Sequence, residues 1–225
     1  MNKFHLSSKT LLQYKDEQLK LFEVLLKKAS KHPRTKNIHQ IRVTMRRLAV
    51  VISSRNLQKL AKVLGNKRDL DVAIENARNY GLRTGKLERA QKKARKKSKR
   101  VLKAFNPMLL KRPPNKNILM AYKIMMRKLT EALASLEKMD MDKKQLHLFR
   151  ITLKQVRYGL EAVGLVQENL QKLQDLLGRI HDLEKLQKLK GKNTRIKKDE
   201  DKAIQKVVAS YEPVIRAVRK ILVRI

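Results

Sequence analysis

Two short blocks of residues occur twice in this chain of 225 residues, in the same order and about 110 residues apart. His39–Arg46 (HQIRVTMR) corresponds to His147–Lys154 (HLFRITLK), and Leu64–Asp71 (LGNKRDLD) corresponds to Leu177–Glu184 (LGRIHDLE). Two separate matches at nearly the same offset are hard to produce by chance, and such self-similarity indicates a repeated structural unit. We therefore predict two similar halves related by internal duplication.

The apolar residues recur with a period near 3.6 almost everywhere, which is typical of helices that bury one face. Seven Gly and five Pro leave few breaks, and no strand pattern competes with this interpretation. The pattern predicts an all-α fold with two similar four-helix bundles, whose helices lie at about residues 8–29, 37–52, 57–77 (interrupted at Gly65), 87–105, 118–136, 146–163, 170–190 (interrupted at Gly178) and 199–225.

The strongest break in the chain contains Pro107, Pro113 and Pro114. Because proline interrupts helices and favours turns, this segment is the candidate linker between the halves. We expect a first repeat at residues 1–106, a linker at residues 107–115 and a second repeat at residues 116–225.

Each half also contains a glycine followed four residues later by an aspartate. Gly65 and Gly178 stand where a C-terminal helix cap is expected, and Asp69 and Asp182 are suited to begin the next helical segment as N-caps. Alternatively, the two aspartates orient a nearby cation through a charge-assisted hydrogen bond. Both roles are compatible.

The chain has 56 Lys and Arg against 20 Asp and Glu, a formal net charge of +36. Charge of this size attracts polyanions, while an apolar fraction of 42% is enough for a real core. The absence of Cys excludes disulfides and thiolate catalysis, and fits a cytoplasmic location. With 4% aromatic residues and no Trp, a stacking platform for single-stranded nucleic acid is disfavoured.

The repeated histidine block places cations beside a core-facing stripe. At about 100° per residue, Arg42 and Arg46 fall on one arc with His39, next to an apolar arc. In the second half, Arg150, Lys154 and Arg157 reproduce the cationic arc beside His147. Ten helical residues extend about 15 Å, so such a line of donors suits an extended anion. Arginine grips phosphate oxygens in pairs, while lysine acts as a mobile point charge.

The two blocks, HxxRxxxR/K followed by LGxxxDL[DE], resemble those of the CHAD family, the conserved-histidine alpha-helical domain. The resemblance covers essentially the whole chain. It implies two four-helix bundles related by a pseudo-twofold axis, and a basic groove or pore that binds inorganic polyphosphate. It also implies association with polyphosphate granules. By position, the family's binding residues correspond to His39, Arg42, Arg46, Arg47, His147, Arg150, Lys154 and Arg157.

This chain departs from the family pattern at three positions. Ala49 replaces a third arginine in the first half, and Gln155 replaces a cation in the second. Because each half keeps what the other has lost, we expect a shared but asymmetric site. His181 stands where second repeats commonly have asparagine, and its role stays open.

A run of cations at residues 85–100 (GKLERAQKKARKKSKR) forms a second candidate surface. Its polar side aligns four residues that would extend an anion track: Arg89, Lys93, Lys96 and Arg100. A solvated helix face explains the run equally well. An amphipathic membrane-surface helix is disfavoured because the apolar side has no aromatic anchor.

The two histidines admit other interpretations. They could be structural, or they could form a metal site with Asp69 and Asp182, but the surrounding cations disfavour a metal. If phosphate binds beside them, the imidazolium is favoured, so affinity should weaken between about pH 6 and 8. A His39→Ala and His147→Ala double variant should lose this pH slope.

No catalytic residue, cofactor or metal is predicted. The sequence contains neither a nucleophile paired with a base nor the cluster of carboxylates that metal-assisted phosphoryl transfer needs. We therefore predict a non-enzymatic polyphosphate-binding protein with no membrane partner. The alternative is a nonspecific nucleic-acid-binding protein, for which the charge is equally natural.

Overall fold

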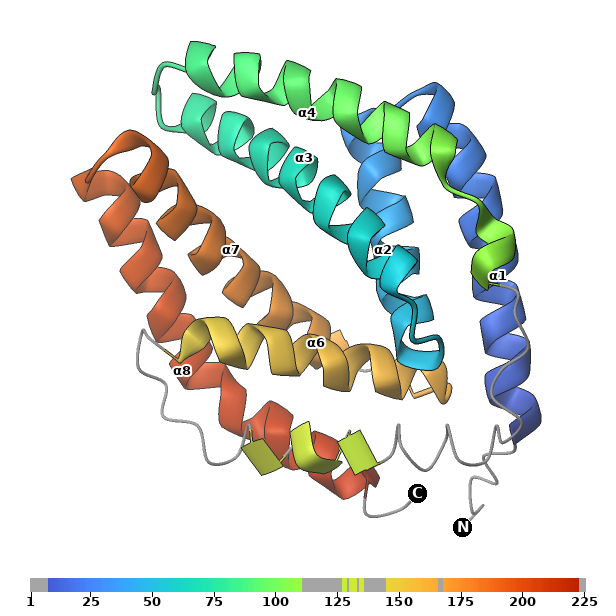
Figure 1. Ribbon diagram of the computed structural model, residues 1–225. Coiled ribbons are helices and arrows are strands. Elements are labelled where there is room, and N and C mark those ends of the chain that lie inside the picture. Colours follow the sequence, from blue (N-terminus) through green and yellow to red (C-terminus); the bar gives the residue numbers. More distant parts are fainter. Residues whose placement is uncertain are drawn as a thin grey trace. The chain divides into compact units, whose positions relative to one another are not determined.

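The computed structural model describes residues 8–110, 145–165 and 168–222, together with residues 127–128, 130–132 and 134–135. This part of the chain is all-α and contains no strand, which confirms the predicted fold class (Figure 1). The elements are α1 (Ser8–Lys31), α2 (Thr35–Val51), α3 (Arg55–Asn79), α4 (Gly85–Ala104), the 3₁₀-helix η1 (Pro107–Leu110), α6 (Leu146–Ala162), α7 (Glu168–Lys190) and α8 (Thr194–Leu222).

The described helices divide into two compact units. One contains residues 12–110, from α1 to η1, and the other contains α6, α7 and α8. Of the predicted linker, Pro107 begins η1, while Pro113 and Pro114 lie outside the described residues. The predicted helix at 118–136 is helical in its described residues from 127 to 135. The duplication and the domain boundaries stay predictions.

The core of the first unit forms where α1, α2 and α3 meet. Ile38, Ile41 and Leu48 of α2 are fully buried beside Phe22 of α1 and Leu60 of α3. Phe22 also packs edge-on against Phe105, with ring centroids 5.6 Å apart. These residues follow the helical period, so the apolar face anchors α2 and its neighbouring edge stays accessible.

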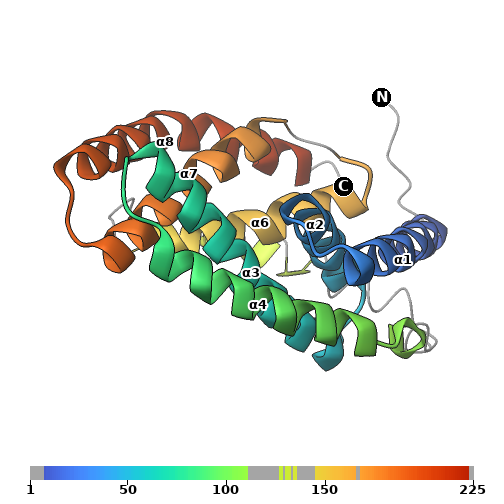
Figure 2. The same ribbon diagram turned by 90° about the horizontal axis from the view of Figure 1, so that it is seen from above.

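The helices α3 and α4 lie side by side (Figure 2) and are joined by a buried polar network. Lys67 pairs with Asp71, one turn further along α3, and their side chains are 2% and 3% exposed. Gln91 of α4 donates a hydrogen bond of 2.9 Å to the other carboxylate oxygen of Asp71. Because buried charges need partners, this network constrains how α4 sits on α3.

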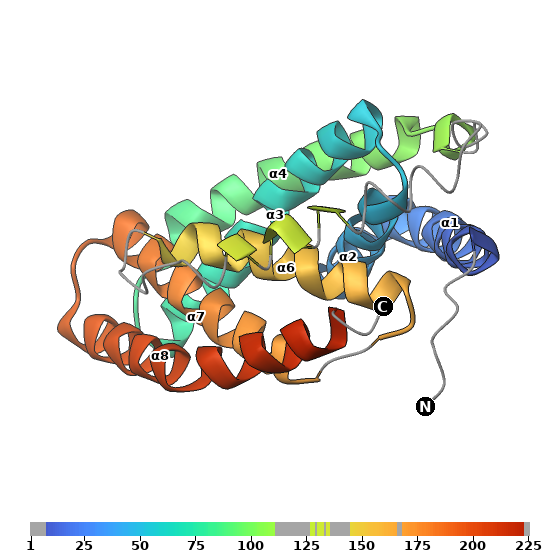
Figure 3. The same cartoon turned by 90° about the horizontal axis from the view of Figure 1, so that it is seen from below.

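The second unit is built on the α7–α8 pair, which runs side by side in Figure 3. Gly191 ends α7 with a φ of +89°, a conformation that favours glycine. Across the pair, Gln187 of α7 donates a hydrogen bond of 2.6 Å to the buried Glu200 of α8. Phe149 of α6 packs edge-on against Tyr211 of α8, at 6.2 Å between centroids.

The predicted helix breaks at Gly65 and Gly178 are wrong. Both α3 and α7 continue through their glycine without interruption. Because Asp69 and Asp182 then lie inside helices, the N-cap interpretation of these aspartates is also wrong, since an N-cap residue needs non-helical backbone angles. The last helix begins at Thr194, earlier than the predicted start near residue 199.

Within the described residues, no helix is both long enough and apolar enough to cross a membrane.

Candidate anion-binding site

The helix α2 carries four predicted binding residues, of which His39, Arg42 and Arg46 share one edge of its buried face, whereas Arg47 lies about 100° further around the helix. His39 is exposed, while Arg42, Arg46 and Arg47 are half-buried. We call this set the first stripe. The second stripe, on α6, shows the same burial, with His147 exposed and Arg150, Lys154 and Arg157 half-buried, although Arg157 aligns with Ala49 and not with Arg47. Each stripe is therefore held on a helix whose other face is fixed in the core.

Arg42 brings the two repeated blocks of the first half together. A Cβ atom added to Gly65 of α3 would lie 2.7 Å from Nη1 of Arg42, closer than real Cβ contacts. The guanidinium of Arg42 therefore lies directly against the α3 backbone, in space that only glycine leaves open. This contact gives Gly65 a packing role inside a helix, in place of the predicted cap.

His39 lies in a strongly cationic environment. Although His39 is largely exposed, partial desolvation of its ring is the main cause that lowers its pKa below the ordinary value. Arg68, Arg46 and Arg42 lower the pKa further because each opposes the imidazolium. Arg68 comes from the second block, on α3, and sequence reasoning did not assign it to the site. Its alignment with His181 was the available signal.

In the second unit, His147 meets the residue at the matching position of the second block. The ring of His147 lies 5.3 Å from that of His181, measured between centroids, with the planes tilted by 32°. His181 aligns with Arg68. Each unit thus places the histidine of its first block beside a basic residue of its second block.

The two units differ around their stripes. A Cβ atom on Gly178 would have no neighbour within 4 Å, in contrast to Gly65. Arg157 aligns with Ala49, which is exposed in the first unit. The resemblance predicted an asymmetric site because each half has a cation that the other has lost. The structure adds a second difference, since Gly65 packs against Arg42 whereas Gly178 has no such neighbour.

Arg157 is partly engaged inside its own unit. Its Nε donates a hydrogen bond of 2.9 Å to Gln174 of α7, and its Nη1 lies 3.9 Å from a carboxylate oxygen of Glu161. Its guanidinium carbon also stands 4.2 Å from the centre of the Tyr158 ring. With its side chain 15% exposed, Arg157 contributes to the α6–α7 contact in addition to its charge.

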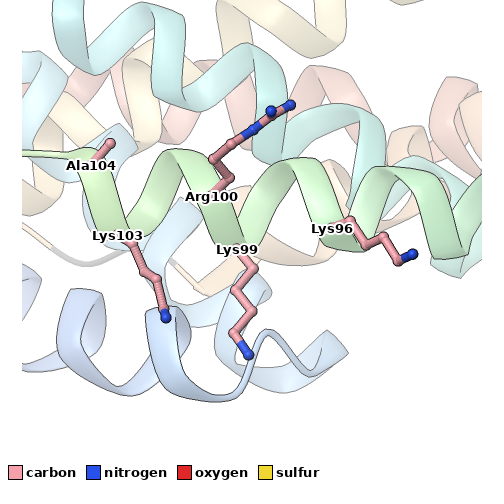
Figure 4. Close-up of a pocket in the computed structure, with 5 residues that line it drawn as sticks. All are labelled: Lys96, Lys99, Arg100, Lys103 and Ala104. Carbon is pink, nitrogen blue, oxygen red and sulfur yellow. The ribbon is translucent and has the colours of Figure 1, made fainter.

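The second candidate surface lies on the outer face of α4. Arg89, Lys93, Lys96 and Arg100 are all exposed, on the side of the helix opposite the buried Leu87, Ala94 and Leu102. Lys96 and Arg100 also line a surface hollow, together with Lys99, Lys103 and Ala104 (Figure 4). The predicted row did not include Lys99 and Lys103.

The metal-site alternative finds no cluster of ligands. Among the described residues, there is no group of three or more His, Asp or Glu side chains that could hold a metal ion. His39 also lies near Arg68, Arg46 and Arg42, and positive neighbours oppose a bound cation.

Comparison with known proteins gives one family and one similar structure. The model of the CHAD domain family matches residues 16–190, a range that includes both blocks of both halves. The chain also resembles the crystal structure of the CHAD domain from the plant Ricinus communis, with a TM-score of 0.58 and 20% identity over 99% of this chain and 93% of that one. No curated protein matches the chain.

Proposed function

Because the chain belongs to the CHAD domain family, we propose that it binds inorganic polyphosphate through the first and second stripes. The observation that carries this proposal is that a basic residue of the second block lies near each stripe histidine: the charge of Arg68 acts on His39, and the ring of His181 lies 5.3 Å from that of His147. Two helices in each unit thereby contribute basic side chains to one edge. A linear polyanion is the ligand that such an edge suits best.

The binding mechanism we propose is electrostatic. The arginines supply paired hydrogen bonds to phosphate oxygens, and Lys154 supplies a point charge. The polymer exchanges its condensed counterions for these side chains, so affinity falls steeply as salt rises. Since α2 and α6 are anchored in their cores, few side chains need to be ordered when the polymer binds.

The outer row of α4 would supply further phosphate contacts through Arg89, Lys93, Lys96 and Arg100. These exposed cations also raise the local concentration of anions around the protein. We propose no catalytic step and no bound cofactor. In a cell, the protein would accompany polyphosphate granules, which a fluorescent fusion imaged beside a polyphosphate stain would test.

The test is calorimetric titration with long-chain polyphosphate. A stripe variant (Arg42→Gln, Arg46→Gln, Arg150→Gln and Lys154→Gln) removes four charges, two from each stripe. A control variant (Lys59→Gln, Lys62→Gln, Lys202→Gln and Lys206→Gln) removes four charges from exposed lysines outside the stripes. We expect at least a hundredfold loss of affinity in the stripe variant and less than tenfold in the control. Equal losses would refute the stripes as the site.

Competition separates polyphosphate from nucleic acid as the ligand. We expect duplex DNA or RNA to displace little long-chain polyphosphate at equal phosphate concentration, because a rigid duplex cannot follow a line of side chains along a single helix edge. Complete displacement by the duplex would instead favour a nonspecific nucleic-acid-binding protein, whose contacts are mainly to phosphates. Phosphate release from polyphosphate, abolished by His39→Ala, would show an enzyme.

A further inference from the structure

A carboxylate follows the second stripe on the same edge of α6. At about 100° per residue, Glu161 falls within the arc of the second stripe, one turn beyond Arg157. The side chain of Glu161 is 17% exposed, close to the 15% of Arg157. The line of basic residues along this edge therefore ends in a partly buried negative charge.

Arg157 is the stripe residue that Glu161 faces. A carboxylate oxygen of Glu161 lies 3.9 Å from Nη1 of Arg157, which is too far for a hydrogen bond. Two other groups fix the guanidinium, because Nε donates to Gln174 at 2.9 Å and the ring centre of Tyr158 lies 4.2 Å from the guanidinium carbon. Phosphate oxygens accept shorter, charge-assisted hydrogen bonds from arginine, so they can compete with the carboxylate for Arg157.

Helix stability does not explain a carboxylate at this position. Glu161 lies in the last turn of α6, which ends at Ala162, and the helix dipole favours cations there. The order of the pair is also the less favourable one, since pairs four residues apart stabilise a helix best when the acid precedes the base. A partly buried ion pair gains little net stability, because both charges lose hydration.

The first stripe has no such carboxylate. Glu161 aligns with Ser53, which is exposed and lies beyond Val51, the last residue of α2. Arg157 aligns with Ala49. The basic residue and the acidic residue thus occur together in the second unit, and both of their counterparts in the first unit are uncharged.

We propose that Glu161 is a specificity-determining residue that sets the end of the second stripe, an inference that rests on the proposed function. Its carboxylate competes with phosphate for the guanidinium of Arg157, and it repels phosphate groups that would bind further along α6. A polymer bound beside His147, Arg150 and Lys154 is therefore turned away at Arg157. Glu161 limits both the affinity and the number of phosphates that the second stripe contacts.

The test is calorimetric titration of the full chain with long-chain polyphosphate at several salt concentrations. Glu161→Gln removes the charge and keeps the size of the side chain. The matched control is Glu168→Gln, the same substitution at an exposed position at the start of α7. Arg157→Gln, alone and combined with Glu161→Gln, shows whether the carboxylate acts through Arg157. Circular dichroism verifies that each variant stays helical.

We expect Glu161→Gln to bind at least threefold more tightly than the wild type. Its affinity should also fall more steeply with salt, by about one unit in the log–log slope, because one more phosphate is contacted. Glu168→Gln, and Glu161→Gln added to Arg157→Gln, should each gain less than twofold.

Two outcomes would overturn this role of Glu161. One is an equal gain in Glu161→Gln and Glu168→Gln, and the other is a full threefold gain when Arg157 is already absent. Both leave the proposed function intact, because the wild type still binds the polymer. No saturable binding by the wild type would refute the proposed function itself, and the role of Glu161 with it.

Discussion

The imidazole rings of His147 and His181 lie 5.3 Å apart between centroids, across the contact of α6 with α7. The matching position to His181 in the first unit is Arg68, whose charge lowers the pKa of His39. Two different basic residues thus occupy the aligned position near the repeated histidine. The aligned position is basic in both units although the residue differs. Mutating His147 and His181 together is therefore more informative than mutating either histidine alone.

The first prediction concerns coupling between these two histidines. In a double-mutant cycle on polyphosphate affinity, we expect His147→Ala and His181→Ala to be non-additive by at least about 0.5 kcal/mol, because side chains in contact share their interactions with one ligand. His181→Ala combined with Arg157→Ala is the control. Arg157 contacts Gln174, which is about 10 Å from His181 along α7, so this pair should be additive. Additivity in both cycles would mean that the two rings act independently.

The second prediction concerns pH. Burial and the neighbouring arginines lower the pKa of His39 in the ligand-free protein. The unfolded chain therefore binds more protons at this position, so the contribution of His39 to stability is present above about pH 6.5 and is lost as pH falls toward the lowered pKa. Without ligand, the melting temperature of the wild type should fall more between pH 7.5 and pH 5.5 than that of the His39→Gln variant. Thermal scans at the two pH values measure this difference.

Polyphosphate should reverse the sign of this effect at His39. A phosphate beside the ring favours the imidazolium, so binding takes up a proton and affinity rises as pH falls from 8 to 6. Titrations at both pH values should show a smaller rise for His39→Gln than for the wild type. If the two proteins have the same slope, His39 is structural.

The third prediction uses the two central glycines. Gly65→Ala places a methyl group against Arg42 and must displace its guanidinium, so we expect polyphosphate affinity to fall three- to tenfold. Gly178→Ala is the control, because nothing lies within 4 Å of the added carbon. It should leave affinity unchanged and stabilise α7 by up to about 1 kcal/mol, the helix preference for Ala over Gly. Urea unfolding and calorimetric titration measure the two effects, and unchanged affinity in Gly65→Ala would remove Arg42 from the binding edge.

The fourth prediction concerns the buried pair of Lys67 and Asp71. Asp71→Ala leaves the ammonium of Lys67 buried without its carboxylate, so we expect a loss of about 3 kcal/mol or more in the free energy of unfolding. Adding Lys67→Met should restore most of that loss, since an apolar side chain needs no partner. The second half already has an apolar residue there, because Ile180 aligns with Lys67 and is buried. Urea denaturation of the wild type, the Asp71→Ala variant and the double variant measures their free energies of unfolding. A double variant no more stable than Asp71→Ala would contradict this account.

The helices and their buried faces were predictable because helical periodicity is a local property. The alternation of Ile38, Ile41 and Leu48 with His39 and Arg42 specifies which face of α2 is buried, whatever α2 packs against. The repeated blocks likewise predicted three residues of each stripe, whose role in binding stays a prediction. Local signals were misleading at Gly65 and Gly178, because a glycine followed by an aspartate has the pattern of a helix end.

What the sequence determined by itself is the all-α class, the anchored faces and the cations beside them. Only the tertiary structure decided which residues of the two blocks meet. Arg42 against Gly65, and His147 beside His181, are contacts between different helices. Such contacts depend on the distance and angle at which helices pack, which side chains from several elements set together. For the same reason, Gly65 lies within α3, in contact with Arg42, and does not end the helix.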